Sequence, residues 1–350
     1  MDIPLLHELC ETPAVPGREE RVRALVQRRI RGLFDSVTTD PLGSLICTRK
    51  PRRTVRGRPA TRVLIAAHMD EIGFYVRHID AQGFLWLNPA GGFDPRNLFA
   101  RRVLVVARGG DFVGVMNAGG KPIHISTDAE RQRVPGTEEF FVDLGMDPKE
   151  VRKKVEIGDF VVMHEPFVEL PEVVVSKALD NRMACFVAIE ALRAVQSSRR
   201  GNAIEIVVAF TTQEEVGLRG AAVAANVARA DIGIGLDVNL ACDTPGVPET
   251  QRVTKQGDGT AVMVQDSSMI SDHSLLQQFC ALARRHRIPH QRAVLPRGGQ
   301  DAAAVQRAAR GARCIALGAG TRYIHTATET INKGDLQATI DLLSTWLLQA

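Results

Sequence analysis

The chain has 350 residues, of which 45% are hydrophobic and 24% are charged, as expected for a globular protein long enough for two domains. Its 44 basic and 40 acidic residues leave a net charge of +4, which is too small to indicate a protein dedicated to nucleic acid or to membranes. No stretch reaches the roughly 18 consecutive apolar residues of a membrane span.

The N-terminus and the cysteines predict a cytoplasmic protein. The segment Met1–Pro4 lacks the basic region and the apolar run of a signal peptide. The six cysteines are scattered without a Cys-x-x-Cys pair, which is typical of reduced, buried thiols and gives no evidence for a thiolate metal site.

The first 71 residues predict two helices and then two strands. The helices cover residues 3–11 and 18–34, and the strands, at 44–47 and 62–68, are expected to pair with each other. The connection between the strands is strongly basic, yet no aromatic residue interleaves it, so a solvated loop is favoured over a nucleic-acid patch. Its basic residues are Arg49, Lys50, Arg52, Arg53, Arg56 and Arg58.

Residues 72–170 have a different pattern from the rest of the chain. Short strands are separated by turn signals such as Asp80-Ala81-Gln82-Gly83, and no long helical pattern appears. We therefore predict a small, mostly β domain inserted into a larger domain formed by residues 1–71 and 171–350. The predicted strands of the insertion are 73–79, 83–87, 102–107, 111–117 and 159–163.

After residue 171 predicted strands alternate with predicted helices. This alternation indicates an α/β fold with a mixed, doubly wound sheet covered by helices on both faces. The strands are expected at 204–210, 232–237, 262–264 and 314–317, and the helices at 180–195, 219–227, 274–285, 301–309 and 334–348.

Polar residues gather where these strands end, and in open α/β sheets ligands bind beyond the carboxyl ends of the strands. Taken singly, each has a simpler explanation: a helix N-cap for the aspartate that opens a helix, a hydrogen-bonded structural histidine, or a solvated glutamate pair. The residues concerned are His68, Asp70, Asp180, Glu214, Glu215, Asp237 and His325.

Taken together, these residues predict a metal centre. Burying two histidines and, besides Asp70, four carboxylates at one edge would be very costly without cations, and mixed imidazole and carboxylate ligands suit Zn²⁺, Co²⁺ or Mn²⁺. His68 and Asp70 are two apart on a strand and point to the same side, so Asp70 is expected to accept a hydrogen bond from the His68 ring. Glu214 and Glu215 diverge, so one can bind metal while the other holds water.

The motifs that surround these residues resemble a known family. The chain is similar to the co-catalytic metallo-aminopeptidases that form tetrahedral shells, known variously as glutamyl, deblocking or leucyl aminopeptidases and, in older usage, as endoglucanase or cellulase M. The resemblance covers essentially the whole chain. It rests on Ala67-His68-Met69-Asp70-Glu71-Ile72-Gly73, Leu179-Asp180-Asn181-Arg182, Glu214-Glu215-Val216-Gly217-Leu218-Arg219-Gly220, Asp237-Val238, Tyr323-Ile324-His325, Gly91-Gly92-Phe93-Asp94-Pro95 and Lys121-Pro122-Ile123-His124.

The resemblance implies a role for each site residue. Asp180 would bridge two divalent metal ions, with a cis peptide bond between Asp180 and Asn181. His68 and Asp237 would complete one metal site, and Glu215 and His325 the other. Glu214 would be the general base, and Asp70 would orient His68.

The same resemblance implies an aminopeptidase for short peptides that assembles from dimers into a homododecamer. Its inserted β-barrel-like domain would make the dimer contacts. Zinc or cobalt would be the metal, with manganese as an alternative. Gln300, Asn239 and Thr326 replace the Thr, Thr and Ser common in the family; none is a ligand position, and the first two bear on side-chain preference.

Three other functions remain open at this stage. A related di-metal deacylase or carboxypeptidase would use the same metals and base. An endoglucanase would need two carboxylates flanking a sugar bond, but it has no use for the surrounding histidines and aspartates. A non-catalytic scaffold would be expected to have lost part of the ligand set, and every position is filled. The sequence does not reveal the preferred N-terminal residue.

Overall fold

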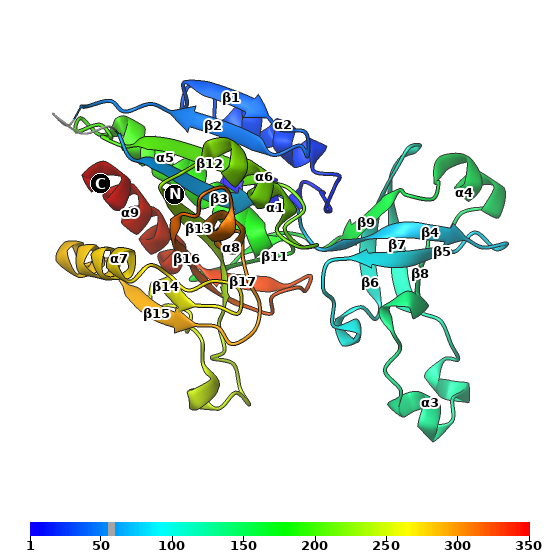
Figure 1. The fold of residues 1–350 in the computed structure, drawn as a ribbon. Helices are drawn as coiled ribbons and strands as arrows, with labels where there is room; N and C mark the ends of the chain where they lie inside the picture. Colours follow the sequence, from blue (N-terminus) through cyan, green and yellow to red (C-terminus); the bar gives the residue numbers. More distant parts are fainter. Residues whose placement is uncertain (55–59) are drawn as a thin grey trace.

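The computed structural model describes residues 1–54 and 60–350 and shows an α/β body with a β-barrel beside it (Figure 1). The body is built on an eleven-stranded mixed sheet in the order β1-β2-β12-β3-β13-β16-β17-β11-β10, with β14 against β16 and β15 against β14. Its strands are β1 (Ser36–Thr39), β2 (Leu45–Arg49), β3 (Arg62–His68), β10 (Val168–Glu169), β11 (Val173–Ser176), β12 (Glu205–Thr211), β13 (Ile232–Leu240), β14 (Thr260–Gln265), β15 (His290–Val294), β16 (Arg313–Arg322) and β17 (Glu329–Asn332).

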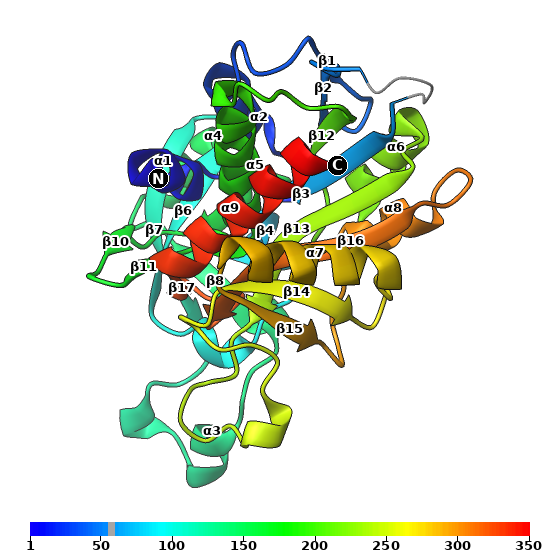
Figure 2. The same ribbon diagram turned by 90° about the vertical axis from the view of Figure 1, so that its left-hand side faces the viewer.

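Four parallel strands, β12, β3, β13 and β16, form the centre of the sheet. They are short apolar runs buried on both faces, as parallel strands usually are. One face is covered by α1, α2, α5, α7 and α9, and the other by α6 and α8 (Figure 2). These helices are α1 (Ile3–Glu11), α2 (Glu20–Arg29), α5 (Leu179–Ser197), α6 (Arg219–Ala228), α7 (His273–His286), α8 (Ala302–Arg307) and α9 (Lys333–Gln349).

The second region is a closed six-stranded barrel in the order β4-β5-β8-β7-β6-β9. Short helices, α3 and α4, project from it (Figure 1). Contacts between the barrel and the body include a bidentate ion pair from Arg21 to Asp111 and a hydrogen bond from the Tyr75 hydroxyl to the Pro16 carbonyl. The elements are β4 (Gly73–Ile79), β5 (Leu85–Ala90), β6 (Arg101–Ala107), β7 (Gly110–Ala118), α3 (Asp128–Gln132), β8 (Phe140–Asp143), α4 (Pro148–Lys154) and β9 (Phe160–Met163).

The predicted fold class, a mixed sheet with helices on both faces and a small β-barrel-like insertion, is confirmed. The expected pairing of the first two strands is wrong. Strand β12 lies between β2 and β3, antiparallel to the former and parallel to the latter. A strand more than 130 residues further along the chain takes the place that sequence proximity assigned to a hairpin partner. The second helix ends at Arg29 rather than at 34, and Gly32 follows with φ +78°.

The basic connection after β2 is also not wholly a solvated loop. Arg49 is the last residue of β2 and is buried, with its guanidinium donating to the carbonyl of Leu33 and to the side chains of Gln196 and Asn202. Burial lowers the pKa of Arg49. Arg56 and Arg58 lie outside the described residues.

The cysteines were predicted to be reduced and buried, and five of the six are buried. All six cysteines are free, and only Cys242 is half-exposed rather than buried. Within the two described ranges, the helices are all too short or too polar to cross a membrane.

Candidate metal centre

The first group of metal-ligating side chains lies at the ends of two neighbouring parallel strands. His68 ends β3, and Asp237 lies near the end of β13. Asp180 reaches the same point from the start of α5, where the peptide bond between Asp180 and Asn181 is cis, as the family resemblance implies. The His68 Nε2 atom lies 3.3 Å from Asp180 Oδ1 and 4.0 Å from Asp237 Oδ1. We call His68, Asp180 and Asp237 the inner group.

A second group shares Asp180 and faces the barrel. The His325 Nε2 atom lies 3.3 Å from the other Asp180 oxygen, Oδ2, and 3.4 Å from Glu215 Oε2. Each oxygen of Asp180 therefore faces a different imidazole, the arrangement of a carboxylate that bridges two cations. We call Asp180, Glu215 and His325 the outer group.

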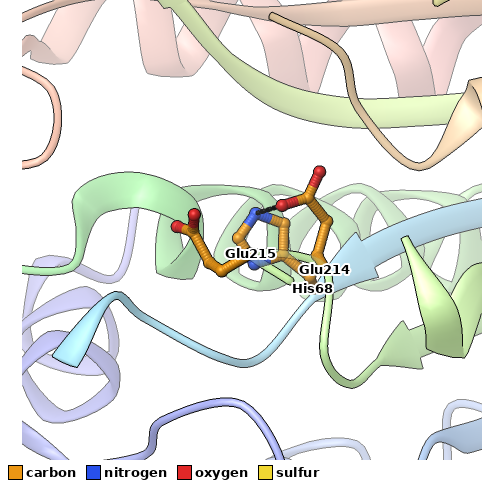
Figure 3. A group of neighbouring side chains, drawn as sticks. All are labelled: His68, Glu214 and Glu215. Carbon is orange, nitrogen blue, oxygen red and sulfur yellow. Dashed lines mark ion pairs between the residues drawn. The ribbon is translucent and has the colours of Figure 1, made fainter. Parts of the chain in front are cut away.

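Glu214 stands beside the inner group and forms a third set of possible metal ligands with His68 and Glu215. Its Oε2 atom lies 3.8 Å from His68 Nε2. Figure 3 shows the carboxylates of Glu214 and Glu215 on opposite sides of the His68 ring, but one oxygen of each lies within 4.8 Å of the other, so the two side chains diverge less than predicted. Both carboxylates are therefore within reach of an ion bound at His68.

The electrostatics of the site are those of acids crowded together away from water. Burial and the neighbouring carboxylates raise the pKa values of Glu214, Glu215 and Asp237 well above their usual range. Burial alone would lower the pKa of His68, but the surrounding carboxylates, Glu214 foremost, outweigh burial and raise it. For Asp180, the two imidazoles outweigh burial and lower the pKa.

Asp70 faces the His68 ring nitrogen that the sequence analysis assigned to it. The His68 Nδ1 atom is 3.1 Å from the backbone carbonyl of Asp70 and 3.6 Å from its carboxylate. The Asp70 carboxylate also accepts the backbone N–H groups of Glu214 and Glu215, both at 3.1 Å. These two partners were not predicted, because they lie 144 and 145 residues away on a loop that only the parallel pairing of β3 and β12 brings alongside.

A second carboxylate, which the sequence did not single out, does the same for the outer group. The two oxygens of Glu329 accept the backbone N–H of Asp180 at 2.9 Å and of His325 at 2.8 Å. Glu329 is 2% exposed, and burial raises its pKa to about 8. Its sequence signal was weak: Glu329 is the single charged residue of strand β17.

Glu19, from the N-terminal segment of the body, holds the backbone of the loop that carries Glu214 and Glu215. Its Oε1 atom accepts the backbone N–H groups of Gly17 at 2.7 Å and Gln213 at 3.0 Å. Burial, followed by the nearby Asp70 carboxylate, raises the pKa of Glu19 to about 7. The sequence placed Glu19 as an acid in the first turn of a helix and gave no reason to connect it with residue 213.

A cavity of about 590 Å³ opens in front of both groups. One wall comes from the barrel region, through Gly92, Phe93 and Asn97, and the others from the body. Leu240, Met263, Leu295, Ala316 and Leu317 line it beyond the metal-ligating residues. The volume and the mixture of an apolar wall with clustered polar groups suit a small organic ligand such as a peptide end.

The chemistry of the donor set fits divalent cations. Buried carboxylates surround two imidazoles at ligand spacing, and the Glu215 Oε1 atom is buried without a hydrogen-bond partner among the described residues. An unpaired buried carboxylate oxygen is costly unless a cation is present. The residues that would hold metal are those of the inner and outer groups.

The fold and the site together define a metal-dependent α/β peptidase, and comparison with known proteins identifies the family. Residues 43–342 match the model of the M42 glutamyl aminopeptidase family, and the chain belongs to that family. It is 32% identical to the putative aminopeptidase FrvX of Escherichia coli K12, over 99% of this chain and 95% of that protein.

Two solved structures are similar over nearly all of their length. The TET aminopeptidase from the marine sediment archaeon Thaumarchaeota archaeon SCGC AB-539-E09 has 31% identity and a TM-score of 0.93, covering 99% of this chain and 95% of that one. The TET1 peptidase of Pyrococcus horikoshii, described as assembling into a tetrahedron or a large octahedral shell, has 30% identity and a TM-score of 0.85, covering 99% and 98%.

Proposed function

We propose that this M42-family metallo-aminopeptidase removes N-terminal residues from short peptides, using two divalent ions and Glu214 as the general base. The observation that carries the proposal is the placement of Asp180, whose two oxygens face His68 and His325 and so join the inner and outer groups. Two ions held in this way would activate a water molecule and polarise the scissile carbonyl. Zinc or cobalt suits the ligand set best, with manganese as an alternative.

The protein's own residues divide the remaining work. Glu214 takes a proton from the attacking water and delivers it to the leaving amine, because its carboxylate lies 3.8 Å from the His68 ring and Asp180 joins the inner and outer groups without it. Asp70 holds the backbone of Glu214 and Glu215, which fixes where both carboxylates point. The carboxylates of Glu214, Glu215 and Asp237 also provide acceptors for the free α-amine of the substrate.

Recognition of the amine determines where the peptide is cut. The amine and the first carbonyl belong to the same residue, so anchoring the amine places the first peptide bond at the metal centre. A blocked amine loses charge-assisted hydrogen bonds worth about 1.5–3 kcal/mol each, which corresponds to more than tenfold per lost contact.

The test compares a free peptide with its N-acetylated twin, before and after prolonged chelation. We expect cleavage of the first bond of the free peptide only, loss of activity on chelation, and recovery with Co²⁺ or Zn²⁺. Comparable cleavage of the acetylated peptide would indicate a deacylase instead. Release of sugar from a soluble cellulose derivative that survives chelation would favour the endoglucanase reading, and full activity without metal would refute the metal proposal.

We further propose that the barrel mediates dimers, and that dimers build a homododecamer. The barrel region exposes six aliphatic side chains between 51% and 67%, which is unusual for a surface that faces only water: Val113, Val115, Ile123, Ile125, Val134 and Ile157. The P. horikoshii relative assembles into closed shells. Light scattering under active conditions should give the mass of twelve chains, and a monomeric mass would refute the assembly.

The free cysteines support a cytoplasmic location.

A further inference from the structure

Asn239 is a buried polar side chain in the active-site cavity that has no partner. It is 3% exposed and lines the cavity together with Asp237. Among residues 1–54 and 60–350, its Oδ1 atom is buried without a hydrogen-bond partner. A buried carboxamide left in this state is costly and rare in native proteins, which indicates that something other than the protein completes it.

The other buried polar side chains of this wall are already occupied. Gln300 accepts the N–H of Ala302 at 2.8 Å and directs its amide nitrogen towards Asp266. The Asp266 Oδ1 atom accepts three donors, from the backbone and hydroxyl of Ser268 and from the backbone of Met269. Both residues therefore build the wall, and Asn239 is the buried polar side chain here that remains available to a ligand, beside the exposed Arg297.

The position of Asn239 defines which part of a substrate can reach it. Asn239 lies two residues beyond Asp237 on β13, so both side chains leave the same face of the strand. The step between them is roughly 7 Å. Opposite Asp237 on β16 is Gly318, where a Cβ atom would lie 1.7 Å from the Asp237 carbonyl oxygen and 2.8 Å from the Asn239 amide nitrogen.

We propose that Asn239 contacts the side chain of the substrate's N-terminal residue and favours side chains that end in a hydrogen-bonding group. Glutamine is the best match. This inference rests on the proposed aminopeptidase activity. The α-amine and the scissile carbonyl must stay at the metal centre, so the group that extends one strand step further is the side chain. A carboxamide offers both a donor and an acceptor, and the carboxamide of glutamine complements both at once.

The expected discrimination follows from the same chemistry. Methionine has almost the length of glutamine but would leave the Asn239 amide unpaired against an apolar group. A site built to hydrogen-bond its substrate rejects an analogue that lacks the polar group more strongly than an apolar pocket rejects an extra methylene. One unpaired buried group corresponds to a preference of about 10-fold or more in kcat/KM.

The test measures kcat/KM for glutaminyl- and methionyl-nitroanilide with the metal-loaded wild-type enzyme and with Asn239→Leu and Asn239→Ala. Wild type should prefer the glutaminyl substrate by about 10-fold or more, and both variants should lose or reverse that preference. Asn97→Leu is the matched control, because Asn97 lines the opposite wall and is half-buried; it should keep the wild-type ratio.

The outcomes separate this inference from the function on which it rests. Cleavage of neither substrate by wild type would refute the aminopeptidase proposal itself. Cleavage of both with a ratio that is the same in wild type and in the two Asn239 variants would overturn the role of Asn239. An equal loss for both substrates would also overturn it, since that result would show that Asn239 acts on the α-amine or on the fold rather than on the side chain.

Discussion

The inner and outer groups share Asp180 but are built in different ways. His68 and Asp237 of the inner group come from adjacent parallel strands, and the His68 side chain is 1% exposed. Glu215 and His325 of the outer group come from loops that follow β12 and β16, and the His325 side chain is 34% exposed. His325 also has a φ of +64°, a conformation that non-glycine residues rarely adopt.

This difference shows how the same kind of ligand can be positioned by different means. Backbone hydrogen bonds of the sheet fix His68 and Asp237, the two residues found only in the inner group. The outer group depends on side-chain contacts to its backbone: Asp70 holds Glu215, and Glu329 holds His325 together with Asp180. We therefore expect the outer group to release metal more readily and to be more sensitive to substitutions outside the ligand set.

The largest expected effect separates proton transfer from metal binding. Glu214→Gln should retain both metals and lose about 10²–10⁴-fold in kcat, the contribution typical of a general base. Glu215→Gln should instead lose metal from the outer group, because its carboxylate belongs to that group. Metal content by mass spectrometry and kcat, measured on both variants, decide between the roles. The reverse pattern would exchange the two assignments.

A smaller effect tests the dependence of the outer group on Glu329. In Glu329→Gln, one oxygen becomes an NH₂ group that faces a backbone N–H, so Asp180 or His325 loses its acceptor. We expect the affinity for one of the two metals to fall by about 10- to 100-fold while the other stays bound.

Chelator titration followed by metal analysis measures this change. Glu169→Gln is a matched control, since Glu169 pairs with Lys333 at the surface, and it should titrate like wild type. Equal weakening of both metals in the Glu329 variant would contradict the distinction between the groups.

The smallest expected effect is on the free energy of unfolding and comes from Glu19. Burial raises the pKa of Glu19 from 4.5 to about 7, so the folded protein binds a proton that the unfolded chain has released between these values. The contribution of Glu19 is fully present below about pH 4.5 and is lost as the pH rises to about 7, with a magnitude of about 1–3 kcal/mol.

Glu19→Gln should flatten this dependence without breaking contacts, because both backbone donors bind the single oxygen Oε1, which glutamine keeps. Urea unfolding at pH 5 and pH 8 measures the difference in the free energy of unfolding for both proteins. Parallel pH profiles for wild type and variant would show that Glu19 does not titrate in this range.

Local pattern was enough to predict much of the molecule. Alternating apolar strands and amphipathic helices identified the α/β body, and short, turn-separated strands identified the β-rich insertion. His68, Glu215, Asp237 and His325 were found because ligands of α/β sheets gather at strand ends, a rule that depends only on where each strand stops. Asp180 was found at the start of a predicted helix, and the division of the ligands between two metals came from the family resemblance.

The sequence could not predict contacts between residues that are far apart along the chain. The placement of β12 between β2 and β3, the burial of Arg49, the partners of Asp70 and the role of Glu329 all depend on long-range packing. A carboxylate accepts any N–H within reach, and no local signal states which one that will be. The 149 residues between Asp180 and Glu329 are brought together only by the assembled sheet, so the sequence determined which residues could bind metal and the tertiary structure decided what holds them in place.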